Sequence, residues 1–148
     1  MYKTIMVAVD GSSVANLALA EASRLGKALG STVHLVHVVD DGYVLYDVGY
    51  LEPTMLNQAL IDAGRKILDT AQQSLIADGV QCSTRLIEEP FSPSDIAITI
   101  EQAAREAKAE LIIMGTHGRR GVKRLVMGSV AEGVLRLSKA PVLMVRGD

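Results

Sequence analysis

The sequence has little of what a secreted or membrane-spanning protein needs. Among its 148 residues there is one cysteine, Cys82, so no intrachain disulfide can form, which suits a reducing cytoplasm. No apolar run approaches the roughly 18 residues that a membrane-spanning helix needs. The opening "KTIMVAVD" is too short for a secretory signal peptide and has no small-residue cleavage site. We therefore expect a cytoplasmic protein without membrane association.

A strong excess of one charge is also absent. The 15 Lys and Arg residues against 17 Asp and Glu residues leave a formal net charge of −2, which predicts no general affinity for nucleic acid or anionic lipid. The hydrophobic share of 49% and the charged share of 22% are typical of globular proteins. The length is that of one ordinary domain. We expect a single domain over residues 1–148, with no internal repeat or linker.

What the sequence does contain is a regular alternation of two hydrophobic patterns. Short apolar runs rich in β-branched residues are typical of buried strands, and longer segments with apolar positions three and four apart are typical of helices. An irregular stretch is expected from residue 40 to 52. Strands are expected at residues 4–10, 32–39, 81–87, 111–114 and 141–145, and helices at 14–29, 53–78, 95–108 and 129–137.

This alternation predicts an α/β fold, a Rossmann-like doubly wound domain with a five-stranded parallel sheet and helices on both faces. We expect the strand order 3-2-1-4-5, with the more polar third strand and the apolar last strand, "PVLMV", at the edges. In such sheets ligands bind beyond the carboxyl ends of the strands, where the strand order reverses. Here "DGSS" and "GTHGRRG" meet at that point.

The stretch "MGTHGRRGVKRLVMGS" at residues 114–129 carries four glycines and four cations with no acid. Glycine permits positive φ and lets backbone amides converge on an anion. Gly128 and Ser129 are expected to open a helix, whose N-terminus favours negative charge. These features predict a phosphate site, with Asp10 facing it from the end of the first strand. The alternatives are a solvated loop and, for Asp10, a helix cap. The cations are Arg119, Arg120, Lys123 and Arg124.

The glycines do not form a Walker A loop, and no G-x-G-x-x-G follows the first strand. Their spacing is Gly115-x2-Gly118-x9-Gly128-Ser129. With this spacing, and with "KTIMVAVDGS", "VHLVHVVD", "AELIIMGTHG" and "GSVAEGVLRLSKAPVLMVR" along its length, the chain resembles the universal stress proteins, specifically their nucleotide-binding branch. The motif of that branch is G-x2-G-x9-G-(S/T). The fold implied is similar to that of the adenine nucleotide alpha hydrolases.

The resemblance implies a role for individual residues. Asp10 would contact the adenine, Val38 would frame the base, and Met114 would line the same pocket. Ala8 stands where relatives often have proline, which removes some rigidity but no hydrogen bond. The residues expected around the ribose and the phosphates are Gly115, His117, Gly118, Arg119, Gly128, Ser129 and Val130.

The three histidines do not point to catalysis or metal binding. His34 and His37 lie three apart in an expected strand, so they face opposite sides of the sheet and cannot hold one metal; both are expected to be structural. His117 lies in the glycine-rich loop, but no Ser and Asp partners accompany it at the spacing of a catalytic triad. We expect neither catalytic residues nor a metal site.

The resemblance implies a regulatory or stress-response protein that binds ATP, AMP or another adenine nucleotide, with or without Mg²⁺. It also implies a homodimer formed through the last strand, residues 141–146, and a regulatory protein partner that the sequence does not identify. Two other functions stay open. One is slow ATP hydrolysis, and the other is an adaptor whose nucleotide pocket is vestigial.

Overall fold

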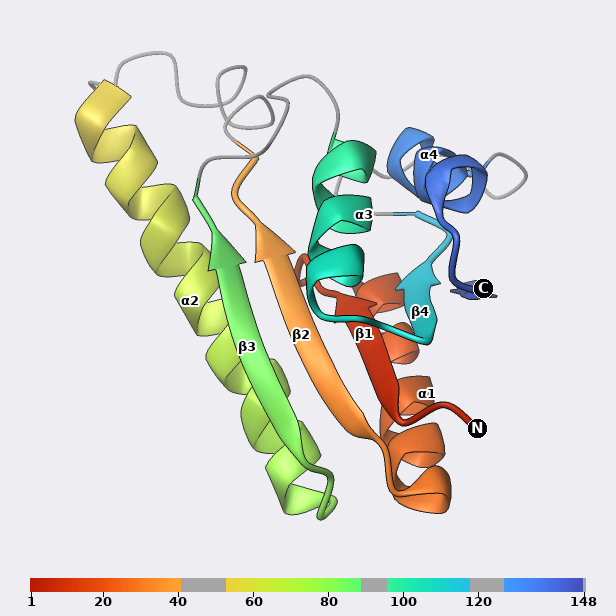
Figure 1. Ribbon diagram of the computed structural model, residues 1–148. Helices are drawn as coiled ribbons and strands as arrows, with labels where there is room; N and C mark the ends of the chain where they lie inside the picture. The colour runs from red at the N-terminus through yellow and green to blue at the C-terminus, as the bar shows by residue number, and fades with distance from the viewer. Residues whose placement is uncertain (41–52, 89–95, 118–126, 148) are drawn as a thin grey trace.

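The computed structural model describes residues 1–40, 53–88, 96–117 and 127–147 (Figure 1). The predicted starts and ends of the elements agree with it to within two residues. The irregular stretch expected after residue 40 lies almost wholly outside the described residues. In chain order the elements are β1 (Thr4–Ala8), α1 (Ser13–Leu29), β2 (Thr32–Val38), α2 (Pro53–Ala77), β3 (Cys82–Ile87), α3 (Ile96–Glu106), β4 (Leu111–Gly115), α4 (Ser129–Leu137) and β5 (Val142–Val145).

The five strands form one parallel sheet in the order β3-β2-β1-β4-β5, which confirms the predicted order. Helices α1 and α2 cover one face of the sheet, and α3 and α4 cover the other (Figure 1). This arrangement follows from right-handed crossovers between parallel strands. The strands at the two edges are β3 and β5, as their sequences predict.

Each face of the sheet carries its own hydrophobic core. On the α1 and α2 face, Val33, Leu35 and Leu75 are fully buried, and on the α3 and α4 face, Ile112 and Val134 are fully buried. Because the central strands are covered on both sides, their sequences are continuous apolar runs rather than alternating ones. The strand β4 is buried at every position.

The two helices of the second face are in direct contact through a glycine. A Cβ atom at Gly133 of α4 would lie 2.6 Å from the Cβ of Ala97 in α3, which is closer than two carbon atoms can approach. The absence of a side chain at position 133 therefore lets α4 approach α3. This contact helps to set where the N-terminus of α4 lies relative to the sheet.

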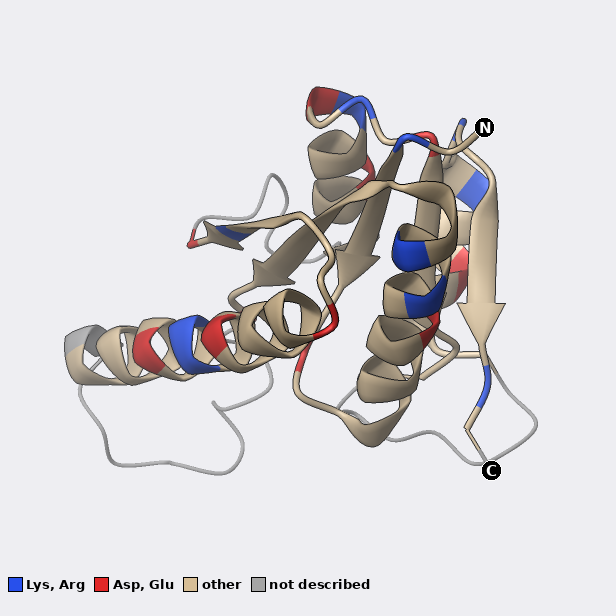
Figure 2. Cartoon of the chain, turned by 90° about the horizontal axis from the view of Figure 1, so that it is seen from below, with Lys and Arg blue, Asp and Glu red and all other residues tan. Residues whose placement is uncertain are grey.

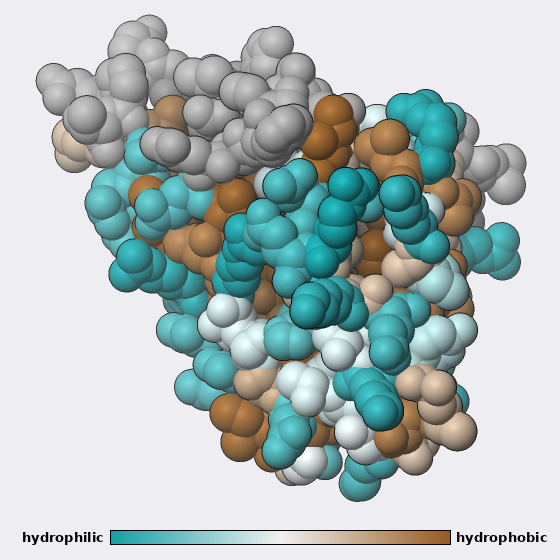
Figure 3. Space-filling model, viewed as in Figure 1, coloured by the Kyte–Doolittle hydropathy of each residue, from teal (hydrophilic) through white to brown (hydrophobic). Residues whose placement is uncertain are grey.

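The surface of the described residues is polar and mixed in charge. Acidic and basic side chains are interspersed along the helices (Figure 2), and hydrophilic side chains cover much of the face that α3 occupies (Figure 3). Within the described ranges, each helix is too short or too polar to traverse a bilayer.

Candidate functional site

The carboxyl ends of β1 and β4 lie next to each other at the point where the strand order reverses. The two strands are paired in register, with Val7 opposite Ile113. Beyond β1 the chain turns into α1 on one face, and beyond β4 it leads to α4 on the other. The structure thus brings the Asp10 turn beside Gly115, as the topology predicts.

Asp10 orders the turn between β1 and α1. Its Oδ1 accepts a hydrogen bond from the Ser12 amide at 2.9 Å, which is the geometry of an Asx turn. The helix cap itself is Ser12, whose Oγ accepts from the Ala15 amide at 3.1 Å. Gly11 between them has φ 81°, an angle that glycine adopts without strain. Ser12, and not Asp10, is therefore the cap of α1. The hydrogen bond from the Ser12 amide holds the Asp10 carboxylate in a defined orientation.

Thr116 joins the end of β4 to the strand β5 and to the start of α4 through backbone hydrogen bonds. Its amide donates to the Val145 carbonyl at 2.9 Å, and its carbonyl accepts from the Gly128 amide at 2.7 Å. The second bond places the N-terminus of α4 directly beyond β4. Thr116 is 5% exposed, and its Oγ1 lies 3.0 Å from Nδ1 of the partly exposed His117. The sequence does not single out Thr116, because the position of a backbone group leaves no signature in the sequence.

Gly128 is the N-cap residue of α4 and has no side chain with which to cap the helix. Its amide is bonded to Thr116, and the first intrahelical hydrogen bond of α4 runs from the Glu132 amide to the Gly128 carbonyl. The amides without an intrahelical acceptor at this helix end are therefore those of Ser129, Val130 and Ala131. The first amides of a helix have no intrahelical acceptor, and the helix dipole favours an anion beside them. Ser129 is exposed and adds a hydroxyl group.

One of the two reasons expected for the motif glycines, a positive φ, was wrong for Gly115 and Gly128. Neither residue has a positive φ; among the described glycines that angle occurs elsewhere. What both positions require is space. A Cβ at Gly115 would lie 2.5 Å from Cγ1 of Val14 in α1, and a Cβ at Gly128 would lie 3.2 Å from the Thr116 carbonyl oxygen. The sequence did not indicate Val14, because its contact with Gly115 joins segments about a hundred residues apart.

Four of the predicted residues contribute to one apolar wall on the α3 and α4 face. Met114 is 5% exposed and belongs to the hydrophobic core there. Ala8 at the end of β1, Val38 at the end of β2 and Val130 in the first turn of α4 are partly buried against the same core. An apolar surface beside a few fixed polar groups is the usual composition of a small-molecule site.

The central part of the glycine-rich loop lies outside the described residues. This applies to Gly118 and Arg119 among the expected contacts. It applies equally to the other cations, Arg120, Lys123 and Arg124.

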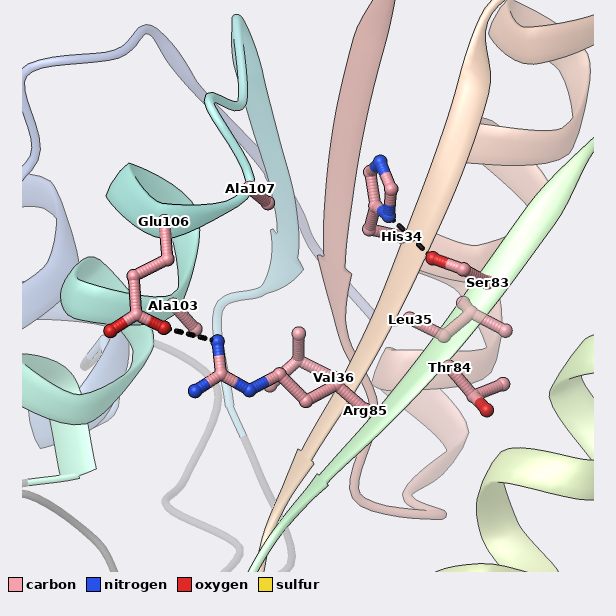
Figure 4. A pocket seen from close by; sticks show the side chains of 9 residues that line it. All are labelled: His34, Leu35, Val36, Ser83, Thr84, Arg85, Ala103, Glu106 and Ala107. Atoms are coloured by element: carbon pink, nitrogen blue, oxygen red, sulfur yellow. Dashed lines mark hydrogen bonds and ion pairs between the residues drawn. The ribbon is translucent and has the colours of Figure 1, made fainter.

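A hollow lies away from these residues, between α3 and the outer half of the sheet (Figure 4). Its volume is about 310 Å³. Arg85 on β3 points across it to Glu106 on α3, and the hydrogen bond from Arg85 lowers the pKa of the Glu106 carboxyl. His34 on β2 is bonded to Ser83 on β3. These polar side chains satisfy one another at a surface where an ion pair contributes little to stability.

The fold defines a class of doubly wound α/β protein, in which ligands bind beyond the carboxyl ends of the strands where the strand order reverses. Within that class, the sequence model of the universal stress protein family matches residues 1–146, and the chain belongs to that family. A universal stress protein of Methanocaldococcus jannaschii is 30% identical over 146 residues, which are 99% of this chain and 83% of the relative.

Solved structures of the same family share the fold. The crystal structure of a universal stress protein family member from Burkholderia pseudomallei is 38% identical and has a TM-score of 0.77, with 97% of this chain and 96% of that chain covered. A universal stress protein of Archaeoglobus fulgidus, solved in complex with dAMP, is 24% identical with a TM-score of 0.70, over 97% and 98% of the two chains. At that identity the likeness concerns the fold alone.

Proposed function

We propose that the protein binds an adenine nucleotide, ATP or AMP, in the crevice between the ends of β1 and β4. The observation that carries this proposal is the 2.7 Å hydrogen bond from the Gly128 amide to the Thr116 carbonyl. This bond holds the N-terminus of α4 beside the end of β4, and a helix N-terminus attracts anions. The Asp10 turn follows β1, the strand that pairs with β4. The Asp10 carboxylate would then lie at one side of the proposed site, and the N-terminus of α4 would lie at the other. A nucleotide needs both, because its base has hydrogen-bond donors and its phosphates are anions.

The base would lie against the apolar wall. Ala8, Val38 and Met114 supply apolar surface for a flat ring, and the Asp10 carboxylate, oriented by the Ser12 amide, accepts a hydrogen bond from the adenine amino group. An ionised carboxylate accepts hydrogen bonds and cannot donate them, so it favours a base with a donor at that position. This arrangement is the basis for expecting adenine rather than guanine.

The phosphates would lie at the other end. The amides of Ser129 and Val130 and the Ser129 hydroxyl supply donors there, and Gly128, the N-cap residue, adds no side chain. The absence of a side chain at Gly115 lets α1 pack against the end of β4, where Val14 lies. Gly118, His117 and Arg119 are proposed to complete this end of the site. Mg²⁺, if it accompanies ATP, would be held largely by phosphate oxygens and water, as is usual for this ion. The dAMP bound by the Archaeoglobus fulgidus relative supports an adenine nucleotide as the ligand.

The test is the change in melting temperature on adding nucleotide. A ligand present at 100 times its Kd stabilises the folded state by about 2.7 kcal/mol, which corresponds to a rise of several degrees for a chain of this length. We expect ATP to produce such a rise and GTP to produce a much smaller one, because guanine places a carbonyl oxygen where adenine has its amino group and two acceptors would then face each other. Equal shifts with both nucleotides would contradict the role of Asp10 in recognising the base.

Two other functions give different results in the same series. An adaptor with a vestigial pocket would show no shift with ATP, AMP, cyclic AMP or GTP. Slow ATP hydrolysis would show a shift with ATP and release of ADP over hours. Hydrolysis requires a positioned water and an orienting group. Asp10 is assigned to the adenine, so it would lie at the end of the nucleotide away from the phosphates.

We infer that the protein regulates rather than hydrolyses. It would act as a homodimer in the cytoplasm, on a protein partner.

A further inference from the structure

His37 links two neighbouring segments of the sheet through its side chain. Its side chain is 7% exposed on the α2 face of β2, and its Nδ1 lies 2.8 Å from the carbonyl oxygen of Val9. Since a carbonyl oxygen only accepts, Nδ1 carries the hydrogen. The ring therefore ties the end of β2 to the residue that follows β1.

This link falls where the sheet between β1 and β2 comes to an end. The Val9 amide still donates to the Val36 carbonyl at 2.9 Å, as in the rest of the parallel ladder. At the level of the next rung a side chain makes the bond instead, and beyond it the chain turns at Asp10. A side-chain bond at this point satisfies a buried carbonyl while it leaves the main chain free to turn away from the strand.

The residues joined are the immediate neighbours of two proposed base contacts. Val9 precedes Asp10, and His37 precedes Val38. A displacement of the ring would move both of these positions relative to each other. The contact thus couples the two elements that would hold the base.

Helix α2 holds the ring in place. A Cβ at Gly64 would lie 2.6 Å from Cδ2 and 3.0 Å from Nε2 of His37, so the ring packs directly on the helix backbone. Three residues further along the same helix, the Ile67 side chain would lie 3.2 Å from a Cβ at Gly11, in the Asp10 turn. The inner side of α2 therefore supports both the ring and the turn.

We propose that His37 is a positioning residue of the nucleotide site, which sets the orientation of Asp10 and Val38 toward the base. The proposal rests on the proposed function, and it goes beyond the structural role that the sequence indicates for this histidine. His37 does not touch the nucleotide. It acts through the Val9 carbonyl.

The test compares His37→Phe, which keeps a ring but removes the donor, with His37→Asn, whose amide can donate from near the position of Nδ1. ATP and GTP affinities are measured by titration calorimetry well below the melting temperature of each variant. We expect ATP binding to weaken about tenfold in His37→Phe and by less than about threefold in His37→Asn. GTP binding should change little, so the preference for ATP falls. A loss of stability alone would not alter that preference in the folded protein.

A second pair of variants tests the same role without removing the donor. Gly64→Ala pushes the ring, whereas Gly26→Ala in α1 places a methyl group 2.9 Å from Cγ1 of Val80, in the core away from the site. Both variants crowd a helix against the sheet. We expect ATP affinity to fall in Gly64→Ala only. ATP affinity that is unchanged in both His37→Phe and Gly64→Ala would overturn the positioning role.

A measurement without nucleotide separates this proposal from the proposed function. Hydrogen exchange of the Ser12 amide reports the Asp10 turn, and exchange of the Ser31 amide, bonded to the Gly26 carbonyl at 3.0 Å, reports the opposite end of the sheet. We expect faster exchange in His37→Phe at Ser12 and not at Ser31. If the unmodified protein binds no ATP, the proposed function is overturned, and this exchange result then decides whether His37 orders the turn. Unchanged exchange at the Ser12 amide in His37→Phe would overturn the role of His37 in ordering the turn.

Discussion

At the residue scale, Gly128 has φ −61° and ψ 152°, angles that any amino acid adopts. A side chain here would therefore not strain the backbone, but its Cβ would lie 3.2 Å from the Thr116 carbonyl oxygen, whose hydrogen bond to the Gly128 amide holds the proposed phosphate end beside β4. We expect Gly128→Val to abolish ATP binding while the protein stays folded, with a loss of helix-capping stability of at most about 1 kcal/mol. Calorimetric titration and circular dichroism measure the two effects.

Two milder changes at the same place serve as controls. Gly128→Ala adds the Cβ alone and should weaken ATP binding less than valine does. Ser129→Ala removes one hydroxyl donor and leaves the helix amides in place, so its effect should be smaller still, about 1 kcal/mol in binding free energy. ATP affinity that survives in Gly128→Val would show that the phosphates bind elsewhere.

At the element scale, α4 is held against α3 where Gly133 meets Ala97. A methyl group at position 133 would overlap the Ala97 side chain, with the two carbons 2.6 Å apart. We expect Gly133→Ala to lower the free energy of unfolding by about 1–3 kcal/mol, the usual cost of overpacking a core, less up to about 1 kcal/mol from the better helix propensity of alanine. Urea unfolding measures the change.

The double variant Gly133→Ala with Ala97→Gly moves the methyl group from one helix to the other and removes the overlap. It should be more stable than the sum of the two single changes predicts, with a coupling of about 0.5–3 kcal/mol. Simple additivity would mean that the helices do not meet at this point. Because α4 begins at the proposed phosphate end, ATP affinity should fall with Gly133→Ala and recover in the double variant.

At the scale of the whole molecule, β5 leaves one edge of the sheet open. Its four residues, Val142–Val145, are apolar but only partly buried, and Leu135 and Leu137 on the preceding helix are 50% and 39% exposed. An apolar open edge favours pairing with a second chain, and an antiparallel pairing across a two-fold axis closes the assembly. We expect a homodimer through residues 141–146, about twice the 15.8 kDa of the chain by light scattering at micromolar concentration. A mass near 15.8 kDa would contradict this.

The backbone of β5 shows which substitution tests the edge. Pro141 accepts from the Ile112 amide at 3.0 Å and Val145 accepts from the Thr116 amide at 2.9 Å, so the odd-numbered residues of the strand face β4. The backbone groups of Met144 then face the open edge. Met144→Pro removes a donor there and should yield monomers, whereas Met144→Ala shortens the same side chain, keeps the donor and should remain a dimer.

Much of the fold was predictable from the sequence, because burial leaves a local pattern. A strand covered on both faces is a continuous apolar run, as β4 is, and Gly30 ends α1 in the left-handed conformation, with φ 67°, that glycine favours. The alternation of elements and the handedness of their crossovers indicated a doubly wound parallel sheet, and the strand order was predicted as the commonest simple arrangement of that kind. The proposed position of the site followed in turn from that order, since it depends only on where the order reverses.

The details of the candidate site depended on contacts between distant segments, which leave no local pattern. The amide of Gly128 meets Thr116, Val14 fills the space beside Gly115, and the ring of His37 reaches the Val9 carbonyl only because the folded sheet puts these groups side by side. The sequence by itself determined the elements, their order and the end of the sheet at which a ligand would lie. The tertiary structure decided which amides remain available there and why the glycines are needed, because hydrogen bonds and steric overlap depend on distances in space.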